Sequence, residues 1–180
     1  MGFAYVSPLC RDTIDQVLTH AIDALGLCGI KLYPPFVEKG LDDPCWEPIY
    51  AFANDRGLPI ISHTDTRPHS QPANWQSVAG RYPNATFICA HTGNMEPARS
   101  QAIRLAQDHP NVMLETASSY RTPGVIEQLV QTVGPQRVLY GSDIPLMDPR
   151  FQIGKVLTAD IPDSAKRLII GGNAERLLGL

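Results

Sequence analysis

Apolar segments recur along this 180-residue chain at nearly equal intervals, and this regular spacing is the feature that most restricts its fold. The segments end near six positions that lie 25 to 30 residues apart, namely Ser7, Tyr33, His63, His91, Thr116 and Asp143. An interval of this size fits one strand followed by one returning helix. The spacing therefore predicts six β/α units that share a parallel sheet.

The segments between these strands have the periodicity and the end signals of helices. Residues 12 to 25 repeat apolar side chains at helical intervals and stop at Gly26. A second helix is expected from Asp43, as its N-cap, to Gly57, a residue type that tolerates a left-handed C-cap. Further helices are expected over residues 97 to 108 and 123 to 133, and a last short helix is expected to be capped by Asn173.

The predicted strands are apolar along their whole length, as burial on both faces of a parallel sheet requires. At this spacing an eight-unit barrel would need about 220 residues, and typical barrels have about 250, whereas the chain has 180. The first interpretation is a (β/α)8 TIM-barrel-type parallel sheet that is incomplete, with about strands 3 to 8 and their helices. The alternative is a complete six-stranded doubly wound domain that binds a nucleotide, which the lack of a G-x-G-x-x-G or P-loop motif weakens.

Composition and charge exclude several classes of function. The 43% of hydrophobic residues suits one globular domain over residues 1 to 180, and no apolar stretch approaches the roughly 18 residues needed to cross a bilayer. The net charge is -3 and basic residues are scattered, so no nucleic-acid-binding surface is expected. The first residues lack the pattern of a secretory signal, and the four cysteines form no C-x-x-C pair, so a reducing, cytoplasmic location is expected.

Three of the predicted strands end in side chains that can bind a metal ion. His63, His91 and Asp143 follow apolar runs, and the carboxyl ends of parallel strands meet at one rim. Imidazole and carboxylate suit a zinc-like ion, which lowers the pKa of a bound water toward about 7. His63 and Asp143 could hold such an ion, or Asp143 could accept a proton from its water, which His91 could orient. The structural alternatives are a histidine bonded to a backbone carbonyl and an aspartate in a turn.

One loop and two strands supply the remaining candidates. Arg67 and His69 lie in a loop and, with Tyr33 at the end of an earlier strand, are the predicted substrate contacts. Arg67 could pair with a substrate carboxylate or could be a solvated loop charge. Lys31 is a charge inside an apolar strand, where it could pair with Glu115.

Five motifs follow one another along nearly the whole chain. They are GIKLYP over residues 29 to 34, LPIISHT over 58 to 64, AHTG over 90 to 93, YGSDIP over 140 to 145 and GNAERLLGL over 172 to 180. Together they resemble the amidohydrolase-related family of metal-dependent TIM-barrel hydrolases and decarboxylases. The resemblance implies that His63 and Asp143 bind a divalent metal, zinc or manganese. It also implies that His91 contacts the substrate or its water, or helps to hold a second metal.

The chain departs from the family pattern in two places. The family usually has glycine where Asp65 stands. The family's first strand ends in a His-x-His pair that supplies two more metal ligands, and no His-x-His occurs in this chain. The resemblance thus implies a barrel without its first two units, in which His63 and Asp143 leave zinc short of the three protein ligands of a catalytic site.

Two functions follow from these observations. The chain is either a metal-dependent hydrolase or decarboxylase that acts on a small molecule, or a catalytically inactive barrel that serves as a subunit or interaction module. In both cases the unpaired strand edges predict that it self-associates as a homo-oligomer or pairs with a complementing N-terminal fragment. The sequence does not name the substrate, because specificity lies in loops that vary independently of the scaffold.

Overall fold

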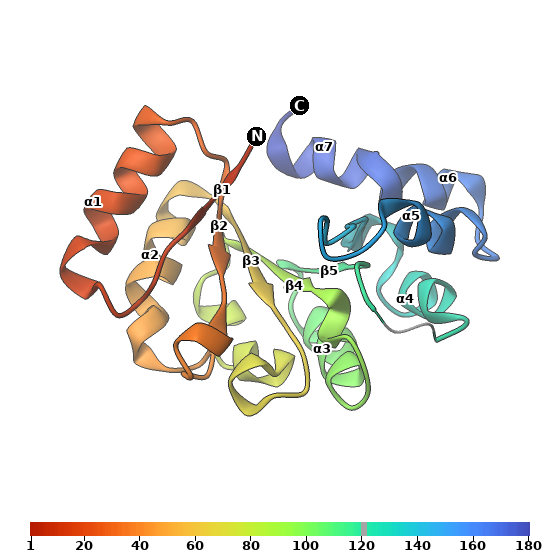
Figure 1. The fold of residues 1–180 in the computed structure, drawn as a ribbon, viewed down its shortest axis with the longest axis horizontal. Helices are drawn as coiled ribbons and strands as arrows, with labels where there is room; N and C mark the ends of the chain where they lie inside the picture. The colour runs from red at the N-terminus through yellow and green to blue at the C-terminus, as the bar shows by residue number, and fades with distance from the viewer. Residues whose placement is uncertain (120–121) are drawn as a thin grey trace.

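The computed structural model describes residues 1 to 119 and 122 to 180 and contains a six-stranded parallel sheet (Figure 1). The strands are β1 (Phe3–Tyr5), β2 (Gly29–Leu32), β3 (Pro59–His63), β4 (Thr86–Ala90), β5 (Val112–Glu115) and β6 (Val138–Leu139). Each strand pairs in parallel with the next strand along the chain. The register of β3 on β4 places His63 opposite Ala90.

The strand order decides between the two predicted folds. A doubly wound domain reverses its strand order at a switch point, whereas the order here follows the sequence from β1 to β6. Sequential parallel order is that of a (β/α)8 barrel, and six strands form an incomplete one. The prediction of an incomplete barrel is therefore confirmed, and the doubly wound alternative is wrong.

Helices connect most of the strands. They are α1 (Ile14–Thr19), α2 (Glu47–Arg56), α3 (Ala98–Asp108), α4 (Val125–Val133), α5 (Pro149–Leu157), α6 (Asp163–Arg167) and α7 (Asn173–Leu178). The predicted C-cap of the second helix is confirmed, because Gly57 has a φ of 65°, whereas the Asp43 carboxylate accepts the Cys45 N–H at 2.9 Å and so caps the 3₁₀ turn Pro44–Trp46 that leads into α2. No helix among the described residues is both long enough and apolar enough to span a membrane.

The prediction that Asn173 caps a separate last helix was wrong. The π-helical turn Leu168–Gly172 leads directly into α7, so no helix begins there from a loop. The Asn173 side chain is buried, and its amide nitrogen donates to the carbonyls of Pro135 and Val138 at 2.7 Å each. Asn173 therefore fastens α7 to the start of β6.

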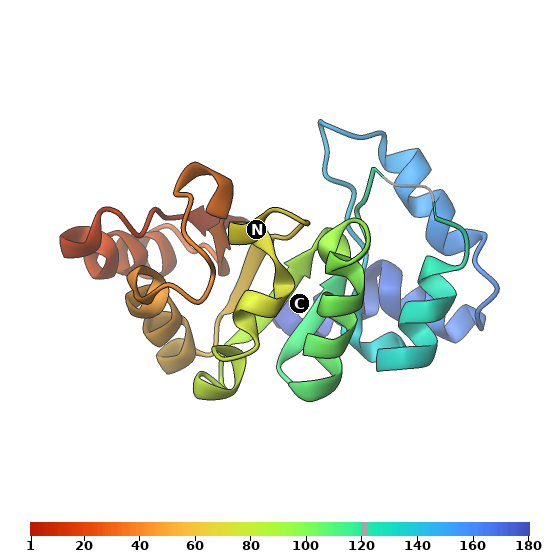
Figure 2. The same ribbon diagram turned by 90° about the horizontal axis from the view of Figure 1, so that it is seen from below.

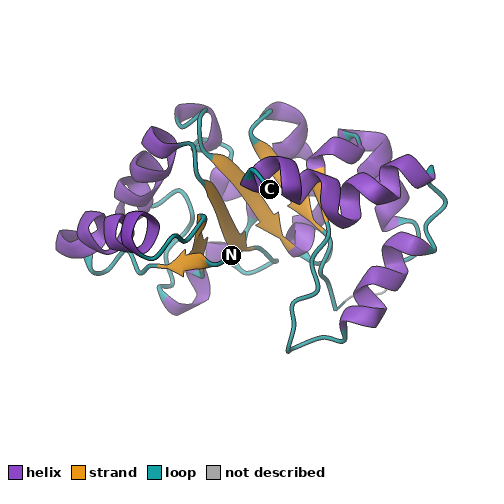
Figure 3. Ribbon diagram, turned by 90° about the horizontal axis from the view of Figure 1, so that it is seen from above, coloured by secondary structure: helices purple, strands orange, loops and turns teal. Residues whose placement is uncertain are grey.

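Alternate residues of the strands divide between two faces of the sheet. One face, with side chains such as Phe87 and Leu114, belongs to the main core, which includes buried residues of α1 to α4. Figures 2 and 3 show how the helices are arranged around the strands. The opposite face is the barrel lumen, where Ile88 and Met113 form a smaller cluster with Leu177 of α7. Several helices thus cover the outer face of the sheet, whereas only part of the short helix α7 covers its lumen face.

Candidate functional site

Two histidines meet at the carboxyl ends of β3 and β4. His63 is the last residue of β3, and His91 directly follows β4. Because the two strands are parallel neighbours, the imidazole rings lie edge to face with their centroids 4.9 Å apart. The structure therefore brings two of the predicted site residues together at one rim.

The turn after β4 holds His91 in an unusual conformation. His91 and Asn94 have φ values of 67° and 65°, which residues other than glycine rarely adopt. The buried hydroxyl of Thr64 stabilises this turn, because it donates to the Ala90 carbonyl at 2.6 Å and accepts the Gly93 N–H at 2.9 Å. Strained backbone that is held by such contacts clusters at functional sites.

Glu115, which is buried at the end of β5, orients His91. Its two carboxylate oxygens accept the N–H groups of His91 at 2.8 Å and Ala117 at 2.7 Å, and the Ala117 carbonyl lies 2.9 Å from Nδ1 of His91. Because a carbonyl only accepts, Nδ1 donates to it, and Nε2 is the ring nitrogen that this contact leaves available as a proton acceptor. Burial raises the pKa of Glu115, although the hydrogen bonds from His91 and Ala117 oppose this shift.

These groups line a cavity of about 300 Å³ in the barrel, here named the lumen cavity. Its polar wall consists of Lys31, His91, Glu115 and Asp143, and its other walls are largely apolar. Burial lowers the pKa of Lys31, while the charges of Glu115 and Asp143 oppose the shift, so Lys31 and Glu115 interact as the sequence predicts. A cation, an imidazole acceptor and two carboxyl groups in one small cavity can bind a small polar molecule and exchange protons with it.

Asp143 reaches the lumen cavity from a loop and not from a strand end. β6 stops at Leu139, and Asp143 follows four residues later with a φ of 53°. The prediction that Asp143 ends a strand was wrong, because the backbone leaves the ladder before it. Gly141 leaves room for the neighbouring carboxylate, since a Cβ at this position would overlap Oε1 of Glu115.

His63 is held by its own loop. Its Nε2 lies 3.0 Å from Oδ2 of Asp65 and 3.0 Å from a guanidinium nitrogen of Arg67, while Nε of Arg67 donates to the same carboxylate at 2.6 Å. Burial lowers the pKa of His63, and the hydrogen bond to Asp65 offsets only part of this effect. The ring of Tyr33 lies 5.1 Å from that of His63, so the predicted substrate contacts Tyr33 and Arg67 both adjoin it.

His69 stands apart from the other predicted residues. It lies in the 3₁₀ turn Pro68–Ser70 and is not among the residues that line the lumen cavity. Its Nε2 is buried and has no hydrogen-bond partner in the described part of the chain. Its role as a substrate contact stays a prediction.

The side chains of the described residues do not by themselves form a metal centre. Among residues 1 to 119 and 122 to 180, no group of three or more His, Cys, Asp and Glu side chains is arranged to hold an ion. His63 and Asp143 have the right donor chemistry, but a catalytic zinc site has three protein ligands. In addition, Nε2 of His63 already contacts Asp65 and Arg67. An ion at this rim would need further donors, and Nε2 of His63 could ligate it only if the contacts with Asp65 and Arg67 opened.

Two residues that shape the site, Glu115 and Thr64, were not predicted from the sequence to contribute to it. Glu115 is treated in the sequence analysis only as a partner for Lys31, although it closes an apolar run in the same way as His63 does. That pattern could have identified it. Thr64 carries no comparable signal, because its importance depends on the turn that packs against it from another strand.

The sequence pattern of the amidohydrolase family matches residues 1 to 180 of this chain. A search of curated proteins found no match to this chain. Among solved structures, an uncharacterized TIM-barrel protein from Bordetella bronchiseptica is similar, with a TM-score of 0.85 and 26% sequence identity over 98% of this chain and 66% of that chain.

Structures of decarboxylases have the same fold at lower identity. The 5-carboxyvanillate decarboxylase from Sphingomonas paucimobilis has a TM-score of 0.80 and 16% identity over 99% of this chain and 66% of its own. A dihydroxybenzoic acid decarboxylase from Polaromonas, solved with bound manganese and 2-nitroresorcinol, has a TM-score of 0.75 and 16% identity over 99% of this chain and 69% of its own. The chain thus spans about two thirds of the length of these structures.

Proposed function

The chain belongs to the amidohydrolase family, and from this membership we propose that it binds a small organic molecule in the lumen cavity and takes part in its hydrolysis or decarboxylation. The observation that carries the proposal is the imidazole of His91, which the Ala117 carbonyl holds with its proton on Nδ1, beside a cavity that Asp143 and Lys31 also line. A histidine in this state is suited to accept a proton from water or from a substrate hydroxyl.

Each polar group has a role in this proposal. Nε2 of His91 accepts the proton, and Asp143 orients the reacting group or accepts a second proton. The Lys31 cation stabilises negative charge on the substrate in a partly desolvated cavity. Arg67 and Tyr33, beside His63, contact the part of the substrate that extends beyond the rim.

A divalent metal, zinc or manganese, would add Lewis-acid chemistry at this rim when bound. His63 and Asp143 supply two donors of the correct type, so the proposal requires that further donors come from outside the described side chains. Nε2 of His63 is engaged by Asp65 and Arg67, so His63 would bind the metal through Nδ1, or through Nε2 once these loop contacts open.

The second candidate function is a catalytically inactive barrel that acts as a subunit. Two observations favour it: Asp65 and Arg67 occupy Nε2 of His63, and no three-donor group occurs among the described residues. In this case the chain retains the barrel fold and the rim residues of the family but binds no metal. The two candidates differ in the metal content of the purified chain.

The deciding experiment is elemental analysis of the purified chain before and after incubation with zinc and manganese. Catalytic function predicts about one metal per chain, lost in His63→Ala and Asp143→Ala and retained in the control His20→Ala, an exposed residue in the π-helical turn His20–Ala24 that follows α1. A metal-bearing chain would then be screened with carboxylated ring compounds and cyclic amides for release of carbon dioxide or for hydrolysis. Absence of metal in the wild type together with absence of turnover would leave the inactive subunit as the function.

We also propose that another polypeptide covers the sheet edges β1 and β6, either a second copy of this chain or a complementing N-terminal fragment. Each of these strands pairs on one side only, and an unpaired edge is a template for association. Sedimentation at micromolar concentration measures this association. A sharply monodisperse monomer that gains nothing from added fragment would contradict it.

A further inference from the structure

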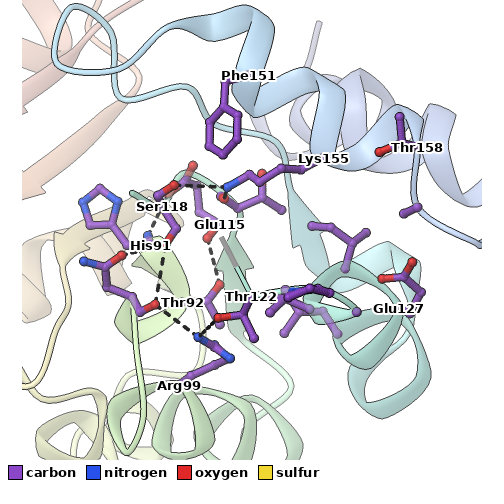
Figure 4. A pocket seen from close by; sticks show the side chains of 18 residues that line it. His91, Thr92, Arg99, Glu115, Ser118, Thr122, Glu127, Phe151, Lys155 and Thr158 are labelled. Atoms are coloured by element: carbon purple, nitrogen blue, oxygen red, sulfur yellow. Dashed lines mark hydrogen bonds between the residues drawn. The ribbon is translucent and has the colours of Figure 1, made fainter. Parts of the chain in front are cut away.

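A second cavity, of about 340 Å³, adjoins the lumen cavity between α3, the end of β5, α4 and α5 (Figure 4). We name it the side cavity. His91 and Glu115 line both cavities and form the boundary between them. A molecule in the side cavity would therefore lie beside the imidazole that the proposed function uses.

The walls of the side cavity are largely apolar. The main contributors are Val125, Ile126, Leu129, Phe151 and Ala159. An apolar cavity of about 150 Å³ is large enough to bind benzene, so a cavity of this size accommodates one ring or a short branched chain with a polar substituent. The shape and the walls suit a small organic ligand better than a bare inorganic ion.

One cation in this cavity lacks an acidic partner. Nζ of Lys155, on α5, donates to the backbone carbonyls of Thr116 at 2.8 Å and Ser118 at 3.4 Å. It has no carboxylate at ion-pair distance among residues 1 to 119 and 122 to 180. Burial lowers the pKa of Lys155 to about 8, with some opposition from the charge of Glu115, so the folded chain disfavours this ammonium ion.

The other charged groups that line the cavity are already bound. Arg99 donates to the Asn94 carbonyl and the Thr122 hydroxyl, and it also lies 3.8 Å from a Glu96 carboxylate oxygen. The Glu115 oxygens accept two backbone N–H groups. A carboxylate oxygen of Glu127 accepts the Asp160 N–H at 2.8 Å. Among the described residues that line the cavity, these contacts leave Lys155 as the charge that a ligand would neutralise.

We propose that the side cavity binds a small organic monoanion, with its apolar body against α4 and α5 and its anionic group at Nζ of Lys155. Within the described part of the cavity, one cation without a carboxylate partner specifies one negative charge, and the apolar walls specify a ring or a short hydrocarbon chain. In the proposed function, the group bound in the side cavity is the non-reacting end of the substrate. The reacting end extends past His91 into the lumen cavity. This part of the inference rests on the proposed function. The substrate class is therefore an organic acid with an anionic group distant from the reacting bond.

The first test compares benzoate with benzamide, which has the same shape and no charge, by calorimetric titration of the full chain at pH 7. Benzoate is expected to bind saturably and at least about tenfold more tightly, a difference of about 1.4 kcal/mol. Lys155→Met should lose this tenfold preference, while Lys155→Arg should keep much of it. Lys39→Met is the matched control. It removes an exposed lysine that does not line the side cavity, and this variant should bind benzoate as the wild type does.

A second variant tests whether benzoate occupies the side cavity without altering Lys155. Ala159→Phe fills the side cavity without changing charge and should abolish benzoate binding. In the wild type, benzoate should also protect Lys155 from acylation by acetic anhydride, which peptide mapping by mass spectrometry would quantify. Binding that ignores charge, survives both Lys155→Met and Ala159→Phe, and gives Lys155 no protection would overturn the proposal.

The same titrations separate this inference from the proposed function. His63→Ala and Asp143→Ala alter the lumen rim and should leave benzoate binding within about twofold of the wild type. Lysine-dependent binding in a chain that shows neither metal nor turnover would retain the side cavity as a ligand site and would reject catalysis. Loss of benzoate binding in both rim variants would assign the ligand to the lumen cavity and would contradict the inference.

Discussion

The helix-covered face of the sheet and its lumen face differ in what fills the space beside the strands. On the helix-covered face, the fully buried ring of Phe87 packs against those of Trp75 and Tyr50, with centroids 5.1 Å and 5.7 Å apart. On the lumen face, the next residue, Ile88, borders a cavity of about 300 Å³ that also holds Glu115. The period of two in a strand thus separates the packing that stabilises the fold from the cavity with charged side chains that can bind a ligand.

Two neighbouring isoleucines on β3 test this difference most strongly. Ile60→Ala, on the helix-covered face, should lower the free energy of unfolding by about 4 kcal/mol, because it empties a fully buried position in a closely packed core. Ile61→Ala, on the lumen face, should lower it by about 2 kcal/mol, because its side chain is already partly exposed and borders a cavity. Urea denaturation measures both. Equal losses would show that the two faces contribute alike.

The hydroxyl of Thr64 connects the two strands that bear the histidines. Thr64→Val keeps the side-chain volume but leaves the buried Ala90 carbonyl and the Gly93 N–H without this partner. A loss of about 2 kcal/mol is expected in urea denaturation. The exposed Thr132→Val is the control and should change stability by less than about 0.5 kcal/mol. A loss no larger than that of the control would contradict the role of Thr64 in holding the turn.

Gly141 lies where the lumen face is most crowded. Gly141→Ala should destabilise the chain by about 1 to 2 kcal/mol, because the new Cβ would displace the Glu115 carboxylate from its two backbone N–H partners. Gly154→Ala is the control, since a Cβ in that helix meets nothing within 4 Å and should be neutral or slightly stabilising. Thermal unfolding of the two variants gives the comparison, and similar melting temperatures would refute the close approach.

Lys155 predicts an effect of a different kind, in the pH dependence of stability. Its pKa is lowered from 10.5 to about 8, so between these values the unfolded chain binds more protons than the folded chain. The free energy of unfolding contributed by this residue therefore rises with pH from about 8 to 10.5. Lys155→Met removes the contribution, so the wild type should gain stability relative to the variant across this window. A difference that stays constant with pH in urea denaturation would contradict the desolvation of Lys155.

Much of the fold could be predicted from local signals. The strand spacing identifies all six strands, and the caps at Asp43 and Gly57 identify the second helix, because caps and periodicity depend on residues a few positions apart. The prediction for Asn173 failed for the corresponding reason. Its side chain bonds to carbonyls 35 and 38 residues away, which no local pattern records.

The sequence by itself determined that the chain forms alternating strands and helices with His63 and His91 at consecutive strand ends. Only the tertiary structure decided that the strands follow one another around an incomplete barrel, that Glu115 and Ala117 orient His91, and that Lys155 stands in a cavity beside it. The physical reason is the separation along the chain over which the interactions act. Strand and helix propensities act between near neighbours, whereas the contacts that build both cavities join residues 24 to 39 positions apart, which only the packed sheet brings together.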